Sequence, residues 1–170
     1  MTPVRTLVVE DFEPFRRYVT SMLKQRPELD VIAEVEDGLA AVQMATDLEP
    51  DLILLDVGLP KLNGIEAGRQ IREVAPESKI LFLSQESSPE VLQGALALGG
   101  RGYVVKAFAQ RDLLAAVDTV LQGNVFVSNG NGLSTSERVK VKQSDDSRNL
   151  DRLKRLTRAP SRDPEDATSF

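Results

Sequence analysis

Short runs of apolar residues alternate with longer segments of mixed polarity along the first three quarters of the chain. Four of the five runs are nearly continuous in Val, Ile, Leu or Phe, which is typical of strands covered on both faces of a sheet. The remaining run, Val31–Val35, is interrupted by Glu34, which favours a place at the edge of the sheet. The pattern predicts five strands: Thr6–Val9, Val31–Val35, Leu52–Leu55, Ile80–Leu83 and Gly102–Val105.

The segments between these runs carry apolar residues at helical spacing. Pro27 is expected to stop the first helix. Ser88 before Pro89 is typical of an N-cap followed by Pro in the first turn, and Gly123 is typical of a C-cap. The pattern predicts five helices: Glu13–Gln25, Leu39–Leu48, Gly64–Val74, Pro89–Leu98 and Arg111–Gln122.

Five strands alternating with five helices predict an α/β fold with a parallel sheet and right-handed crossovers. Five units are too few for an eight-fold barrel. We therefore expect a flavodoxin-like, doubly wound (βα)5 sheet with strand order 2-1-3-4-5.

The alternation ends after residue 128, where Asn129–Gly132 is typical of a turn or linker. We expect one domain over residues 1–128. Residues 129–170 contain only seven large apolar residues, which favours a polar, mostly disordered linker and tail. Within it, leucines three residues apart predict a short helix over 149–158, although an isolated helix of that length is marginal in water.

The composition restricts the chemistry. His, Cys and Trp are absent, which excludes a Ser–His–Asp triad, a Cys nucleophile, disulfides and metal sites built on imidazole or thiolate. Any site must therefore rest on carboxylates, Lys, Arg, hydroxyls and backbone groups, and carboxylates favour hard cations such as Mg²⁺.

The net charge of −5 is unevenly distributed. Residues 130–170 carry 9 Lys and Arg against 7 Asp and Glu, so residues 1–129 carry 12 against 19. An acidic domain with a weakly basic tail gives no strong signal for direct binding to nucleic acid. The sequence shows neither a membrane-length apolar run nor a signal-peptide pattern, so we expect a soluble, cytoplasmic protein with no membrane partner.

Polar residues follow four of the predicted strands. Glu10 and Asp11 follow the first, Asp56 the third, Ser84 the fourth and Lys106 the fifth. Because ligands of open parallel sheets bind beyond the carboxyl ends of the strands, we expect the three carboxylates to converge there. Such a cluster repels itself unless a cation neutralises it, so the sequence predicts a Mg²⁺ site with a fixed ammonium beside it.

This set of groups suits phosphoryl transfer, which needs in-line positioning and neutralisation of charge on the phosphoryl oxygens. The Asp56 carboxylate can act as the nucleophile without a general base. The metal ion, the Ser84 hydroxyl and the Lys106 ammonium would each contact one phosphoryl oxygen.

Four stretches together resemble one family: LVVEDFEPFRRYV, PDLILLDVGLPKLNGIE, ILFLSQESS and ALGGRGYVVKAF. Over residues 1–128 the chain resembles the receiver domain of two-component response regulators. It is most similar to the receiver part of members that carry a helix-turn-helix domain, although we expect no such domain within residues 129–170.

The resemblance implies a role for each residue at the predicted edge. Glu10 and Asp11 would bind Mg²⁺ together with Asp56 and the backbone carbonyl of Gly58. Asp56 would accept a phosphoryl group from a sensor histidine kinase or a small phosphodonor.

The resemblance also implies a switch. Ser84 and Lys106 would contact the phosphoryl group, and Tyr103 would swing inward as the Ser84 hydroxyl moves. This movement would remodel the surface of helix four, strand five and helix five, which an unidentified downstream protein or a second copy of the chain would read. The protein would be a phospho-acceptor rather than an enzyme.

Two positions depart from the family pattern. Ala107 stands where many members have Pro after the lysine, and a cis bond before a residue other than Pro costs about 2.5–4 kcal/mol. We therefore expect a trans bond or a rearranged loop at Lys106. Gln85 stands where a small residue is common, which would restrict access to the phosphoryl group.

Other interpretations remain open from the sequence. A phosphatase of the haloacid dehalogenase type also places Asp after an apolar strand, but it needs a second acid where this chain has Gly58. An adaptor independent of phosphorylation and a regulator that binds DNA through residues 149–158 are further alternatives. Four residues also have ordinary interpretations when taken singly: a helix cap for Asp11, a loop hydroxyl for Ser84, a solvated charge for Lys106 and a half-buried strand residue for Tyr103.

Overall fold

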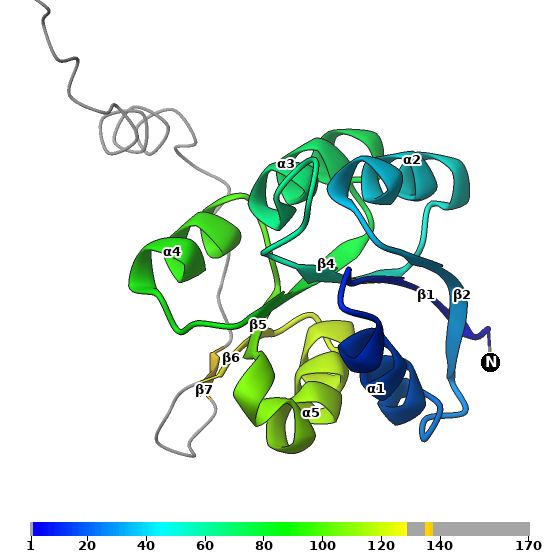
Figure 1. Ribbon diagram of the computed structural model, residues 1–170. Coiled ribbons are helices and arrows are strands. Elements are labelled where there is room, and N and C mark those ends of the chain that lie inside the picture. Colours follow the sequence, from blue (N-terminus) through cyan, green and yellow to red (C-terminus); the bar gives the residue numbers. More distant parts are fainter. Residues whose placement is uncertain (1, 129–134, 138–170) are drawn as a thin grey trace, which may run out of the picture. The chain divides into compact units, whose positions relative to one another are not determined.

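The computed structural model describes residues 2–128 and 135–137 (Figure 1). All five predicted strands and all five predicted helices are present, and their ends lie within two residues of the predicted ones. The strands are β1 (Val4–Val9), β2 (Leu29–Val35), β3 (Leu52–Asp56), β4 (Lys79–Ser84), β5 (Gly102–Val105), β6 (Val125–Val127) and β7 (Thr135–Glu137). The helices are α1 (Glu13–Leu23), α2 (Gly38–Leu48), α3 (Gly64–Val74), α4 (Pro89–Ala97), the 3₁₀ helix η1 (Lys106–Phe108) and α5 (Ala109–Leu121).

The sheet has the order β2-β1-β3-β4-β5-β6-β7, and its first six strands run parallel. This confirms the doubly wound fold and the order 2-1-3-4-5 of the five predicted strands. Helices α1 and α5 cover one face, and α2, α3 and α4 cover the other (Figure 1). The interrupted run β2 lies at the edge, as its sequence predicts.

Strand β3 is buried along its whole length. Leu54 belongs to the apolar cluster below α1 and α5, whereas Ile53 and Leu55 belong to the cluster below the other three helices. Because side chains alternate between the two faces of a strand, a continuous apolar run is what a strand covered on both sides requires. The charged Asp56 ends this run at the carboxyl edge of the sheet.

Two strands have no counterpart in the prediction. Strand β6 pairs in parallel with β5, and β7 pairs antiparallel with β6. The short sequence of β6 falls below the length at which an apolar run indicates a strand. Strand β7 lies inside the segment predicted as a tail, and it covers backbone groups of β6 that would otherwise form a sheet edge. The predicted helix at 149–158 lies outside the described residues.

Local signals set the ends of several helices. The side chains of Asp37, Asn63 and Ser88 accept hydrogen bonds from backbone amides in the first turns of α2, α3 and α4, respectively. Gly123 follows the last residues of α5 with φ of 85°, a conformation that favours glycine. The three caps mark where the loops at the carboxyl edge of the sheet end, and Gly123 marks where the loop from α5 to β6 begins.

A buried carboxylate joins α5 to the end of β6. Asp112 accepts a hydrogen bond from the Ser128 hydroxyl at 2.7 Å and two from the Arg111 guanidinium. The Ser128 amide also donates to the Tyr103 carbonyl of β5. These bonds, led by those from Arg111, hold the pKa of Asp112 below its ordinary value of 3.8 although burial acts in the opposite direction.

We expect Asp112→Asn to lower the free energy of unfolding at neutral pH by about 1–3 kcal/mol, because charged hydrogen bonds to a buried group are lost. A lowered folded pKa contributes stability above the ordinary pKa and loses it as the pH falls through the folded pKa. The difference between variant and wild type should therefore shrink below pH 3.8. Urea unfolding at several pH values measures it. Asp118→Asn is the control. Asp118 lies on α5 like Asp112, but it is half-exposed and pairs with Arg26, so its replacement should lower the free energy of unfolding by less.

Candidate functional site

The strands bring the predicted residues to one edge of the sheet. Glu10 directly follows β1, Asp56 ends β3 and Lys106 directly follows β5. Strand β3 lies beside β1, with Val9 opposite Leu55, so the two carboxylates leave the sheet at neighbouring points. The predicted convergence at the carboxyl edge is therefore present.

Three carboxylates form a cluster at this edge. One oxygen each from Glu10, Asp11 and Asp56 lies within 4.8 Å of the others. Glu10 and Asp56 are buried, with 0% and 3% of their surface exposed, whereas Asp11 is exposed. Asp11 does not cap α1, because Phe12 occupies the N-cap position and no side chain caps that helix.

The cluster fits a hard divalent cation. All its donors are carboxylate oxygens, which Mg²⁺ prefers, and Asp11 gives the site a side that faces solvent. Glu10 Oε2 is buried and makes an ion pair but no hydrogen bond within the described part of the chain, so it retains capacity for a ligand.

Lys106 lies against two of these carboxylates. Its Nζ is 2.8 Å from Glu10 Oε2, 3.0 Å from Glu10 Oε1 and 3.2 Å from Asp56 Oδ1. Residues 2–128 contain no cis peptide bond, so the bond before Ala107 is trans as expected. The chain turns into η1 at this point, and the lysine still reaches both carboxylates.

Burial has the largest effect on the pKa of both buried acids, Glu10 and Asp56. Desolvation raises the pKa of Glu10, and the Asp56 charge adds to the rise while Lys106 opposes it. Desolvation likewise raises the pKa of Asp56, against the charge of Lys106 and the hydrogen bond from the Gly58 amide. Two buried carboxylates with one ammonium leave an excess negative charge, which a bound cation would neutralise.

The loop after β3 is held close to Asp56. The Gly58 amide donates to Asp56 Oδ1 at 3.1 Å, and the Gly64 amide donates to the Val57 carbonyl. A Cβ on Gly64 would stand 1.9 Å from the Asp56 carbonyl oxygen, so only glycine lets α3 begin this close to β3. The role predicted for the Gly58 carbonyl stays a prediction.

Ser84 and Tyr103 meet at one backbone carbonyl. Both hydroxyls donate to the carbonyl of Glu86, at 2.9 Å from Ser84 and 2.7 Å from Tyr103. Tyr103 is 1% exposed, so it points inward and is not a half-buried strand residue. The Ser84 hydroxyl also accepts from the Glu86 amide. Glu86 is a part of this arrangement that the sequence did not indicate, because only its backbone takes part.

The acidic residues after β2 lie apart from the cluster, as the edge position of that strand predicts. Asp37 caps α2 and pairs with Lys61 at 3.3 Å. Glu36 pairs with Arg16 at 3.2 Å. Gln85 is exposed in the β4–α4 loop.

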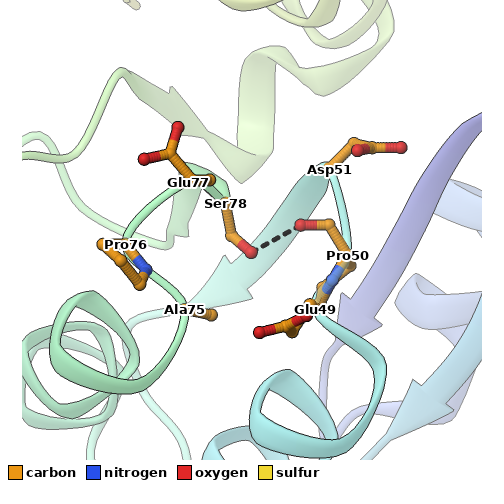
Figure 2. A pocket seen from close by; sticks show the side chains of 7 residues that line it. All are labelled: Glu49, Pro50, Asp51, Ala75, Pro76, Glu77 and Ser78. Atoms are coloured by element: carbon orange, nitrogen blue, oxygen red, sulfur yellow. Dashed lines mark hydrogen bonds between the residues drawn. The ribbon is translucent and has the colours of Figure 1, made fainter.

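A hollow lies at the opposite edge of the sheet, and none of the three clustered carboxylates lines it (Figure 2). It lies between the turns before β3 and β4, and Ser78 donates there to the Pro50 carbonyl. The Arg5 amide donates to Asp51, and the Arg5 guanidinium donates to the Glu49 carbonyl. Because these polar groups are hydrogen-bonded to one another, we interpret the hollow as the place where two turns pack together.

The fold and the site define a doubly wound α/β domain that carries three clustered carboxylates and an ion-paired lysine at the carboxyl edge of its sheet. Residues 6–118 match the family described as "Response regulator receiver domain", and the chain belongs to that family. This confirms the family predicted from the sequence. Receiver domains bind Mg²⁺ at an acidic pocket, and the carboxylate cluster is of that kind.

Curated relatives agree with this assignment. The chain is 34% identical over 124 residues to "Transcriptional regulatory protein DegU" of Brevibacillus brevis, which covers 73% of this chain and 52% of the relative. It is 35% identical over 126 residues to "DNA-binding transcriptional activator DevR/DosR" of Mycobacterium tuberculosis, with 74% and 58% covered. The chain thus spans about half the length of these relatives.

Solved structures show the same fold. A two-component response regulator of the LuxR family from Aurantimonas sp. SI85-9A1 has a TM-score of 0.70 at 27% identity, with 76% of this chain and 91% of that chain covered. The response regulator domain of Thermotoga maritima CheB has a TM-score of 0.65 at 27% identity, with 71% and 97% covered. Among the described residues, no helix is long and apolar enough to span a membrane.

Proposed function

We propose that this chain is a phosphorylation switch that accepts one phosphoryl group on Asp56. The observation that carries the proposal is the convergence of Glu10, Asp11 and Asp56 around one edge with Lys106 between two of them. The site supplies a nucleophile, a cation site and a fixed positive charge, which are the groups that phosphoryl transfer to a carboxylate uses without a general base.

The proposed step forms a bond between an Asp56 carboxylate oxygen and phosphorus. The bond from phosphorus to the donor breaks, and the donor leaves with that electron pair. Lys106 Nζ, 3.2 Å from Asp56 Oδ1, stabilises negative charge on a phosphoryl oxygen, and the Ser84 hydroxyl is expected to contact another. Mg²⁺, when bound, would neutralise further phosphoryl charge.

The carboxylates of Glu10, Asp11 and Asp56 and the backbone carbonyl of Gly58 would hold the cation. We assign Glu10 as a buried ligand rather than as the nucleophile, since Lys106 Nζ contacts both of its oxygens and the Phe12 amide also donates to Oε1. This division of roles leaves Asp56 as the acceptor.

The proposed output is a change at α4, β5 and α5. Ser84 and Tyr103 share the Glu86 carbonyl, so a Ser84 hydroxyl that turns to the phosphoryl group leaves that carbonyl to Tyr103. This change in the hydrogen bonds of the Glu86 carbonyl would shift the loop before α4 from one conformation to another. We infer a sensor histidine kinase as the cytoplasmic phosphodonor and a protein, either a downstream partner or a second copy, as the reader of this surface.

Intact-protein mass spectrometry tests the proposal. Incubation with acetyl phosphate and Mg²⁺ should add the mass of one phosphoryl group, and peptide mapping should place it on Asp56. A chelator added beforehand should prevent the gain. No gain with Mg²⁺ present, or a phosphoryl group on another residue, would contradict the proposal. Sustained release of phosphate from a phosphate ester would favour a phosphatase instead.

A further inference from the structure

Helix α1 supports the site through Arg16. The guanidinium is mostly buried, with 13% of the side chain exposed, and its Nη1 donates to the backbone carbonyl of Glu10 at 2.9 Å. Its Nη2 lies 3.2 Å from Glu36, and its Nε lies 4.0 Å from Glu34. One side chain therefore ties the loop that carries the acidic pair to the carboxyl end of β2.

The residue before it supports the site at a second point. Lys106 Nζ lies 4.9 Å from the centre of the Phe15 ring, so the ammonium is placed between this ring and the carboxylates of Glu10 and Asp56. Phe15 also packs against the apolar cluster below α1 and α5, which fixes the ring. A ring face attracts a cation, so Phe15 restricts where the lysine head can lie.

We propose that Arg16 and Phe15 are positioning residues with separate tasks. Arg16 sets the backbone position of Glu10 and hence the geometry of the cation site. Phe15 sets the position of the Lys106 ammonium and hence the stabilisation of the transferring group. The inference rests on the proposed phosphorylation of Asp56 and names residues that touch neither the cation nor the phosphoryl group.

Physical chemistry separates the two tasks. Mg²⁺ tolerates little deviation from its preferred geometry, and groups that orient a metal ligand commonly change metal affinity by about 10–100-fold. Loss of the Arg16 contacts should therefore act on cation binding. A displaced ammonium acts on the charge that develops during transfer, so loss of the Phe15 ring should act on the rate at saturating cation.

The test combines the initial rate of phosphorylation by acetyl phosphate at a series of Mg²⁺ concentrations with the Mg²⁺ dissociation constant measured by calorimetry without phosphodonor, both on the full chain. Arg16→Gln should raise the half-saturating Mg²⁺ concentration about tenfold with little change in the maximal rate. Arg16→Lys, which keeps the charge but loses the fork geometry, should recover part of the loss. Phe15→Leu should lower the maximal rate about three- to tenfold and leave the half-saturating concentration unchanged.

Neighbouring residues on α1 provide matched controls. Arg17 is 78% exposed and pairs with Glu13, and Tyr18 lies 6.0 Å from the Phe15 ring without the lysine contact. Arg17→Gln and Tyr18→Leu should leave both parameters unchanged. A merely structural role would move both parameters together or neither, so the split is the diagnostic result.

The outcomes are distinguishable from failure of the proposed function. If the wild type gains no phosphoryl group, the proposed function itself is wrong. If the wild type is phosphorylated but Arg16→Gln and Phe15→Leu behave like the controls, the positioning inference is wrong.

If Arg16→Gln does not fold, Glu36→Gln removes the exposed anchor of the same guanidinium and should shift the Mg²⁺ dependence in the same direction by about two- to threefold. An unchanged Mg²⁺ dependence would then overturn the inference for Arg16.

Discussion

Replacing Asp56 by Asn is expected to abolish phosphoryl uptake, and the matched variant Asp37→Asn is expected to retain it. The Asn amide lacks the charge and nucleophilicity of the carboxylate, and it also weakens the cation site. Asp37 follows β2 and pairs with Lys61 outside the cluster, and Asn can keep its cap on the Ala40 amide. Intact-mass measurement after incubation with acetyl phosphate and Mg²⁺ compares the two.

The same substitution should also raise the stability of the protein without Mg²⁺. Burial raises the pKa of Asp56, so the folded state binds more protons than the unfolded state above pH 3.8. The free energy of unfolding therefore falls as the pH rises through the raised pKa, and at neutral pH the ionised carboxylate is a cost. Removing it leaves Glu10 and Lys106 as a balanced pair, so we expect a gain of about 1–2 kcal/mol.

Added Mg²⁺ should reverse the order of stability, so that wild type becomes more stable than Asp56→Asn. A cation that binds the folded state stabilises wild type according to its affinity, and the variant has lost one ligand. Urea unfolding at neutral pH, with chelator and then with Mg²⁺, measures both effects. An Asp56→Asn variant that is less stable than wild type with chelator would contradict the electrostatic argument, even if phosphorylation were lost.

The sequence was sufficient for the regular parts of this fold. Continuous apolar runs identify strands buried on both faces, and helix caps such as Ser88 have local signals that do not depend on tertiary structure. The site was predictable because polar residues at strand ends must meet at one edge once the strands are parallel. Glu10, Asp56 and Lys106 required no knowledge beyond the strand order.

Other parts depend on contacts that a linear pattern does not encode. Strand β6 is too short to produce a periodic signal, and it forms because β5 offers an edge for pairing. Arg16 and Phe15 stand on α1 at positions that suit any amphipathic helix, and their contacts with Glu10 and Lys106 appear only in three dimensions. Basic and aromatic residues just after an acidic pair are the only trace they leave in the sequence.

Replacing Lys106 by Met should separate cation binding from phosphoryl transfer. Met keeps much of the length of the side chain and removes the charge, so Glu10 and Asp56 lose their shared partner. With a fixed positive charge gone, the carboxylates should bind Mg²⁺ more tightly. The transferring group loses a preorganised donor, and such losses commonly cost about 100–1,000-fold in rate.

The measurement is the phosphorylation rate at saturating Mg²⁺ together with Mg²⁺ affinity by calorimetry. Lys61→Met is the control, because Lys61 forms an ion pair with Asp37 outside the cluster. It should leave both quantities near wild type. If Lys106→Met instead weakens Mg²⁺ binding and leaves the rate at saturating Mg²⁺ unchanged, the ammonium organises the carboxylates and does not act on the phosphoryl group. Tighter Mg²⁺ binding with a rate at least about 100-fold lower assigns the lysine to the transfer step, because no loss of the cation could then explain the slower reaction.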